Sequence, residues 1–132
     1  MKEFSRRLLA YETASRKPTD AKDSAASCVC EKLRGPLGKL LGVAGFGAVF
    51  FRALALAGAE VPWLRALKIK ADGSLEGLDE IEAKLDSRAV ADGEVILVAQ
   101  LLGLLVMFIG SALTLGLVQE AWPKATFQQS QF

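Results

Sequence analysis

Residues 95–118 read VILVAQLLGLLVMFIGSALTLGLV, a run of 24 residues without one charged side chain. As an α-helix this run is about 36 Å long, which exceeds the ~30 Å hydrocarbon core of a bilayer. Its 15 Leu, Ile, Val and Phe residues contribute roughly −4 to −9 kcal/mol on a membrane-insertion scale, so we expect the segment to insert unaided. The stretch predicts the main transmembrane helix of a membrane protein.

A second apolar stretch, residues 40–59, reads LLGVAGFGAVFFRALALAGA and is interrupted by one charge, Arg52. Its nine Leu, Val and Phe residues contribute roughly −3 to −5 kcal/mol on the same scale, whereas Arg52 costs about 2.5 to 3.5 kcal/mol. The segment is therefore near break-even by itself and predicts a weaker transmembrane helix. Together with residues 95–118 it predicts an all-α fold built on a two-helix transmembrane hairpin.

The N-terminal segment, residues 1–39, is predicted to lie in the cytosol. Phe4, Leu8 and Tyr11 are spaced i, i+4 and i+7, which is typical of a short amphipathic helix. Its apolar side is expected to lie either on a membrane surface or on the protein's own core. A polar stretch with Pro18 and no apolar periodicity follows, and it predicts a linker.

Residues 60–94 form the predicted connecting loop. Residues 68–73, KIKADG, alternate in polarity and end in Asp-Gly, which predicts a short hairpin or tight turn. Leu78, Ile81 and Leu85 follow with i, i+3 and i+7 spacing, which predicts an amphipathic helix of about two turns in this loop. The loop is therefore expected to carry one small helix of its own.

The charges of the chain are unevenly distributed and predict its orientation. Residues 1–39 carry nine Lys and Arg against five acids, and residues 60–94 carry five against nine. Because basic segments tend to stay on the cytosolic side, the N-terminus is predicted to be cytosolic. With two spans, the C-terminal tail, residues 119–132, is then cytosolic as well, and the acidic loop lies on the other side.

Small and polar residues share one side of each apolar helix. Projected at about 100° per residue, Gln100, Gly103, Gly110 and Thr114 lie on one side of the longer helix, and Arg52 lies among alanines on the shorter one. Membrane helices pack through small residues and turn costly polar groups inward. We therefore predict a helix–helix interface at these five residues. In an antiparallel hairpin the levels of Arg52 and Gln100 differ by about 3 Å, which predicts a hydrogen bond between them.

The polar inventory excludes several classes of function. The chain has no histidine, which removes the commonest general base and metal ligand. Cys28 and Cys30 are the only cysteines and are too close for an ordinary disulfide. Basic residues are interleaved with acids rather than gathered on one face, so no nucleic-acid surface is predicted. We predict no catalytic, cofactor-binding or metal-binding residue and no small-molecule substrate.

The leading interpretation is a small non-enzymatic integral membrane protein, an accessory or assembly subunit, whose partners are the lipid bilayer and other membrane helices or a second copy. The alternative is a soluble, cytoplasmic all-α interaction domain that buries both apolar segments in its own core or in a dimer. In that alternative Gly110-Ser111 divides the long segment into two helices, with Ser111 as the N-cap of the second. A cleaved signal peptide ending at residues 57–59 is disfavoured, because 39 residues precede its apolar core and Arg52 interrupts it.

Overall fold

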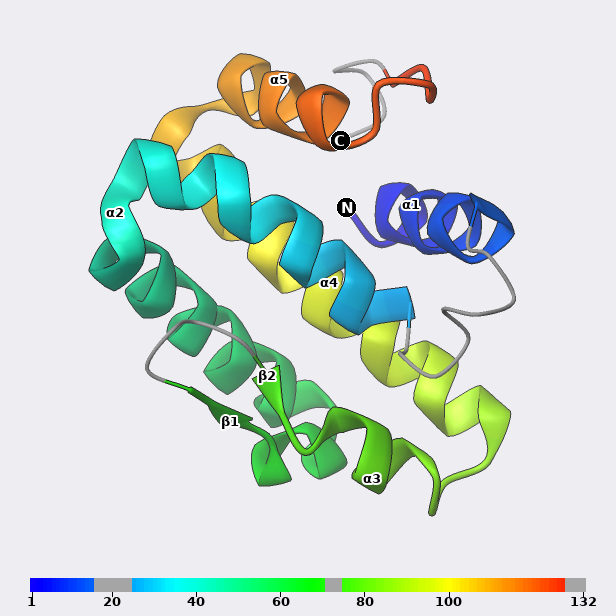
Figure 1. The fold of residues 1–132 in the computed structure, drawn as a ribbon. Coiled ribbons are helices and arrows are strands. Elements are labelled where there is room, and N and C mark those ends of the chain that lie inside the picture. The colour runs from blue at the N-terminus through cyan, green and yellow to red at the C-terminus, as the bar shows by residue number, and fades with distance from the viewer. Residues whose placement is uncertain (16–24, 71–74, 128–132) are drawn as a thin grey trace.

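The computed structural model describes residues 1–15, 25–70 and 75–127. The chain is mostly helical, as an all-α sequence predicts, with one small two-stranded sheet (Figure 1). In chain order the elements are α1 (Lys2–Ser15), α2 (Ala25–Glu60), η2 (Pro62–Ala66), β1 (Lys68–Ile69), β2 (Leu75–Glu76), α3 (Leu78–Glu82), α4 (Ser87–Ile109) and α5 (Ser111–Ala121).

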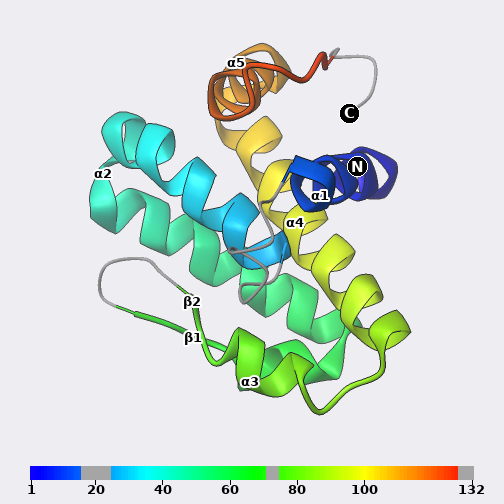
Figure 2. The same ribbon diagram turned by 45° about the vertical axis from the view of Figure 1, so that its right-hand side comes forward.

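Helix α2 is 36 residues long and folds back on itself at Gly42, whose backbone has φ 78° and ψ 165°. Positive φ is accessible to glycine because it has no Cβ atom. The break divides α2 into a first half, residues 25–41, and a second half, residues 43–60, which run side by side in opposite directions (Figures 1 and 2). The apolar helix predicted at residues 40–59 therefore begins only after Gly42.

Helix α4 begins at the N-cap Asp86, whose carboxylate accepts a hydrogen bond of 2.7 Å from Ala89 N. It ends at Gly110, which has φ 86° and joins it to α5. The single helix predicted for residues 95–118 is thus divided, because Gly110 adopts a conformation that no helix contains. Gly110 itself is the N-cap of α5 and makes no side-chain cap bond, so Ser111 does not have the capping role considered above.

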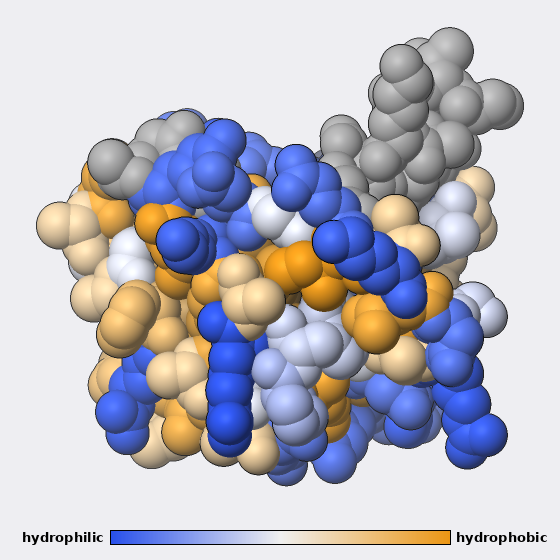
Figure 3. All heavy atoms as spheres, turned by 90° about the horizontal axis from the view of Figure 1, so that it is seen from below, coloured by the Kyte–Doolittle hydropathy of each residue, from blue (hydrophilic) through white to orange (hydrophobic). Residues whose placement is uncertain are grey.

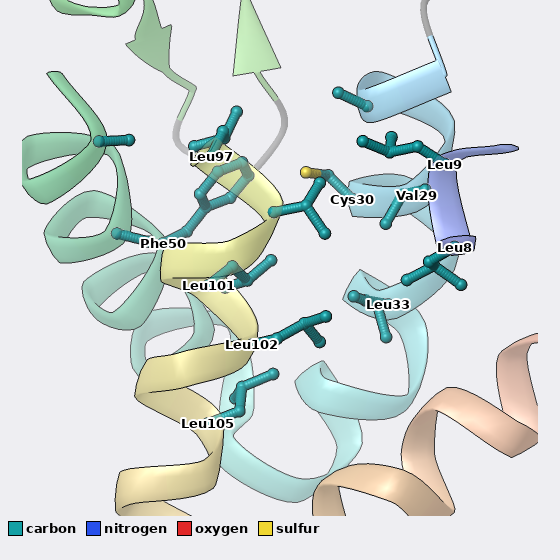
Figure 4. Packing of buried hydrophobic residues seen from close by; sticks show 14 of the residues in the cluster. Leu8, Leu9, Val29, Cys30, Leu33, Phe50, Leu97, Leu101, Leu102 and Leu105 are labelled. Carbon is teal, nitrogen blue, oxygen red and sulfur yellow. The ribbon is translucent and has the colours of Figure 1, made fainter. Parts of the chain in front are cut away.

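The hydrophobic core surrounds α4, which packs mainly against α2 and α1. Figure 4 shows Leu101 and Leu102 of α4 between Phe50, from the second half of α2, and Leu33, from the first half. Leu8 of α1 closes the core beside Leu33, and all five side chains are buried. The first half of α2 and α1 therefore cover one side of α4, and the second half of α2 covers another.

The N-terminal amphipathic helix is present as α1. Its Phe4 and Leu8 are buried in the protein's own core, and Tyr11 is half-buried against it. The ring of Phe4 lies 5.2 Å from that of Phe127. The sequence left two positions open for this helix, a membrane surface or the protein's own core. In the structure it lies on the core. Residues 16–24, which contain most of the predicted linker, lie outside the described residues.

The connecting segment contains the predicted hairpin. Lys68 pairs with Glu76 and Ile69 with Leu75 in an antiparallel arrangement. The Asp-Gly turn itself falls at residues 71–74, outside the described residues. The predicted loop helix is shorter than its periodicity suggested, because α3 has only five residues.

The segment η2 attaches the loop to the start of α4. Trp63 Nε1 donates a 3.3 Å hydrogen bond to Ala89 O, and the indole lies directly over Gly93. A Cβ atom on Gly93 would lie 2.2 Å from Cζ2 of Trp63, so only glycine permits this approach. Arg65 Nε donates to Gly58 O at 2.9 Å and ties η2 to the end of α2 as well.

Candidate functional site

The exposed apolar side chains gather at one end of the molecule. Within the described residues, six large apolar side chains are exposed: Leu40, Val43, Phe51, Met107, Phe108 and Leu113. All except Phe51 lie within three residues of Gly42 or Gly110, the two glycines that break the apolar helices. Both breaks lie at the same end of the bundle in the two views (Figures 1 and 2), and we call it the glycine end.

Two helices in the described parts of the chain are long and apolar enough to cross a membrane: Cys28–Glu60 of α2, and α4. In the most apolar 18 residues of each, only 28% and 39% of the residues are buried. Figure 3 shows apolar residues, in orange, interrupting the hydrophilic surface on the lower face of the molecule. The chain by itself therefore leaves much of its apolar helix surface uncovered.

The structure separates the five residues of the predicted interface. Thr114 is buried and its Oγ1 donates a 2.8 Å bond to Gly110 O within the same helix. Gln100 and Gly103 are half-buried, and Arg52 and Gly110 are exposed. Among the described residues, no hydrogen bond joins Arg52 to Gln100. The side of the second half of α2 that carries Arg52 faces away from α4.

The side of the second half of α2 that carries Arg52 is exposed along its whole length. The exposed residues of this small face are Ala44, Ala48, Arg52, Ala55 and Ala59. The opposite, larger side chains fill the core, among them Phe46, Phe50 and Leu54. Among the described residues, none packs closely against the small face.

A buried polar cluster joins three helices that are distant in sequence. The carboxylate of Glu12, which is 2% exposed, accepts a 2.8 Å hydrogen bond from Trp122 Nε1 and a 2.7 Å bond from Lys32 Nζ. The Lys32 ammonium also lies 5.7 Å from the centre of the Trp122 ring. The cluster ties α1 to α2 and to the end of α5. Sequence analysis missed it, because partners 20 and 110 residues apart leave no local pattern.

A second buried carboxylate caps α2. Glu94 of α4 is 9% exposed and accepts a 2.8 Å bond from Ala26 N, one of the first backbone N–H groups of α2. A carboxylate at a helix N-terminus satisfies an otherwise unpaired donor and interacts favourably with the helix dipole. Glu94 therefore fixes the position of the first half of α2 on α4.

A groove of about 440 Å³ lies where α2 folds back on itself. Its lining residues are Glu31, Arg34, Gly35, Gly38 and Lys39 from the first half, and Val43 and Phe46 from the second half. Lys39 and Val43 lie close to the fold-back at Gly42, whereas Glu31 and Arg34 lie further back along the first half. Glu31 accepts a 2.6 Å bond from Arg34.

The described residues contain no group of three or more metal-binding side chains. Cys28 is half-buried, Cys30 is buried, and the two form no disulfide. Comparison of the chain with protein families, with curated proteins and with solved structures finds no match.

Proposed function

We propose that this chain is a small non-enzymatic integral membrane protein, an accessory or assembly subunit that acts through contacts with other membrane helices. The second half of α2 and α4 cross the bilayer as an antiparallel pair. At 1.5 Å per residue they are about 27 Å and 34 Å long, close to the ~30 Å of the hydrocarbon core.

The observation that carries the proposal is the uncovered apolar surface of these two helices. Phe51 is 69% exposed and Met107 78%, in segments where fewer than half of the residues are buried. The core helix of a soluble protein buries most of its apolar surface. Each Å² of apolar surface that stays in water loses about 25 cal/mol of stabilisation that burial would give. Lipid or other apolar helices would cover it without that loss.

The distribution of charge favours one topology. The first span begins and the second ends at the glycine end, whereas the first half of α2 runs back along the second half, so that Ala26 lies beside Glu94 near the start of α4. The excess of Lys and Arg in residues 1–39 favours a cytosolic position for both termini. The hairpin β1–β2 and α3 then lie on the opposite side.

A second candidate, a soluble all-α interaction domain, is favoured by a different observation. α1 and the first half of α2 cover one side of α4, and the buried carboxylates of Glu12 and Glu94 hold them there. Such polar ties are usual in water-soluble bundles. In this case a second protein, rather than lipid, covers the small face and the glycine end.

Washing membranes with alkaline carbonate separates the two candidates. We expect the full chain to remain in the washed membranes and to need detergent for release. Release into the soluble fraction would overturn the membrane proposal and favour the soluble domain.

Labelling of single cysteines tests the topology. In a chain lacking Cys28 and Cys30, Lys70→Cys in the loop is expected to react with an impermeant thiol reagent on intact cells, whereas Lys124→Cys after α5 is not. Reaction at both positions after lysis is the control for accessibility. Equal labelling of the two on intact cells would contradict the hairpin topology.

A further inference from the structure

We propose that the small face of the second half of α2 docks a transmembrane helix of a different protein, and that this helix carries a glutamate or aspartate near its middle, paired with Arg52. This inference rests on the proposed membrane location, and it names the chemistry of the partner and the residue that selects it.

Arg52 lies at the middle of its span. At 1.5 Å per residue it is about 14 Å from Val43 and about 12 Å from Glu60, the two ends of the second half of α2. An arginine side chain is shorter than either distance, so its guanidinium cannot reach the headgroups as it does near a helix end. Arg52 is therefore placed at the depth of the bilayer where a charge costs most.

No group of the described chain compensates this charge. Arg52 is exposed and forms no ion pair or hydrogen bond with the described residues. Residues 35–59 and 95–118 contain no acid, so neither span supplies a carboxylate. Charged groups inside a membrane pair with one another, and a carboxylate matches the guanidinium with two parallel hydrogen bonds. Because lipid phosphates lie only at the ends of the span, the counter-charge must come from another protein.

A second copy of this chain does not meet that need. Since Arg52 lies at mid-span, two small faces packed together would bring the two Arg52 side chains to the same depth, whether the helices ran parallel or antiparallel. Like charges repel strongly where the dielectric constant is low. The acid of the first half nearest this depth, Glu31, is already paired with Arg34 at 2.6 Å. The partner is therefore a different protein.

The shape of the small face suits a closely packed helix. Ala44, Ala48, Ala55 and Ala59 flank Arg52 along the helix, and all four are exposed. Small side chains let the backbones of membrane helices approach closely, and polar groups then bond across the interface. A helix seated there would shield the ion pair from acyl chains.

The first half of α2 independently favours a protein beside this bundle. Counted along the helix, Glu31 and Arg34 lie about 12 to 17 Å from the fold-back at Gly42, and Arg52 lies about 15 Å from it. All three charges thus lie at a similar depth. Acyl chains solvate none of them, whereas a protein with polar side chains at that depth does.

The test uses synthetic transmembrane helices as partners. Each is a Leu/Ala helix of about 24 residues with lysines at both ends, and the central residue is Glu, Gln or Leu. Energy transfer between a dye on the peptide and one on Lys124→Cys, in the chain lacking Cys28 and Cys30, reports association in phosphatidylcholine vesicles. We expect the Glu peptide to bind about tenfold more tightly than the other two, the effect of one good interhelical polar contact.

Variants at Arg52 test which residue makes the selection. Arg52→Leu should remove the preference for the Glu peptide, and Arg52→Glu should transfer it to a peptide with a central lysine. Arg88→Leu, which removes an exposed arginine outside the span, is the matched control and should keep the preference.

A second pair of variants tests the surface itself. Ala48→Leu places a larger side chain on the small face and should weaken binding of every peptide. Val43→Leu is the control, because nine residues at about 100° each place Val43 on the opposite side of the helix from Arg52. Its peptide binding should be unchanged.

Equal binding of the Glu and Leu peptides, or an unchanged preference in Arg52→Leu, would overturn the inference. A dimer in detergent that Ala48→Leu dissociates would also overturn it and assign the small face to a second copy. A chain that resists carbonate but shows no preference for the Glu peptide refutes this inference alone. Release of the chain by carbonate refutes the membrane proposal and this inference with it.

Discussion

The buried carboxylate of Glu12 gives a quantitative prediction about what holds α1 and the end of α5 to the bundle. Its side chain is 3% exposed, and one oxygen, Oε2, accepts both the Trp122 indole and the Lys32 ammonium. Glu12→Leu removes both bonds and leaves the buried indole N–H without an acceptor. Lys32 is 43% exposed and can turn to water, so most of the loss comes from the indole. We expect the free energy of unfolding to fall by about 2 kcal/mol.

The converse change, Trp122→Phe, leaves the carboxylate with one partner and should cost about 2 kcal/mol as well. In the double variant neither polar group remains buried without its partner, because both are replaced by apolar side chains. The free energy of unfolding of the double variant should therefore fall by about 2 to 3 kcal/mol, which is less than the sum of the two single losses. The difference corresponds to a coupling energy of about 1 to 2 kcal/mol.

Denaturant unfolding followed by circular dichroism measures all four proteins in the same detergent or buffer. Glu3→Gln is the control, because Glu3 is 71% exposed and lies 3.6 Å and 3.9 Å from Arg6 and Arg7. An exposed pair of this kind contributes less than about 0.5 kcal/mol. Losses that add within about 0.3 kcal/mol in the double variant would refute the reasoning, since independent sites are additive.

Three further predictions follow from the glycines and the cysteines. Gly110→Ala places a side chain at φ 86° and should lower stability by about 1 to 3 kcal/mol in thermal unfolding; an unchanged midpoint would mean that the break is absent. Gly93→Ala forces a Cβ atom against the Trp63 indole and should cost about 1 to 3 kcal/mol, and Trp63→Leu in the same chain should recover part of the loss; no recovery would place the strain elsewhere. In the folded protein a thiol reagent should modify half-buried Cys28 before buried Cys30, with equal rates in denaturant; faster reaction at Cys30 would contradict its burial.

Apolar periodicity predicted the helices but not where they break. Residues 40–59 contain four glycines and residues 95–118 contain three, and each of them is acceptable in an apolar helix. Only Gly42 and Gly110 have positive φ within these stretches. Which glycine breaks the helix depends on how the chain can fold back to bury the most apolar surface. That is a property of the whole bundle rather than of the local sequence.

Arg52 lies outside the core of the chain for an energetic reason. Sequence analysis assigned the small face of the second half of α2 to packing, following the rule for membrane helices. The structure packs the opposite side, where Phe46 and Phe50 lie with ring centres 5.6 Å apart. A buried aromatic ring removes far more apolar area from contact with solvent than an alanine does. Within one chain the larger side chains therefore take the core, and the small face stays outward.

The charges on the first half of α2 restrict how lipid can surround α4. This half covers one side of α4, and its outer surface carries Glu31, Arg34 and Lys39. Each such charge at the centre of a bilayer would cost about 2.5 to 3.5 kcal/mol on the insertion scale. Acyl chains can therefore contact the second half of α2 and the uncovered part of α4, but not the outer side of the first half. If α2 keeps its fold in the membrane, that side lies at the depth of the hydrocarbon core and must face the polar surface of another protein, as it would in the proposed accessory subunit.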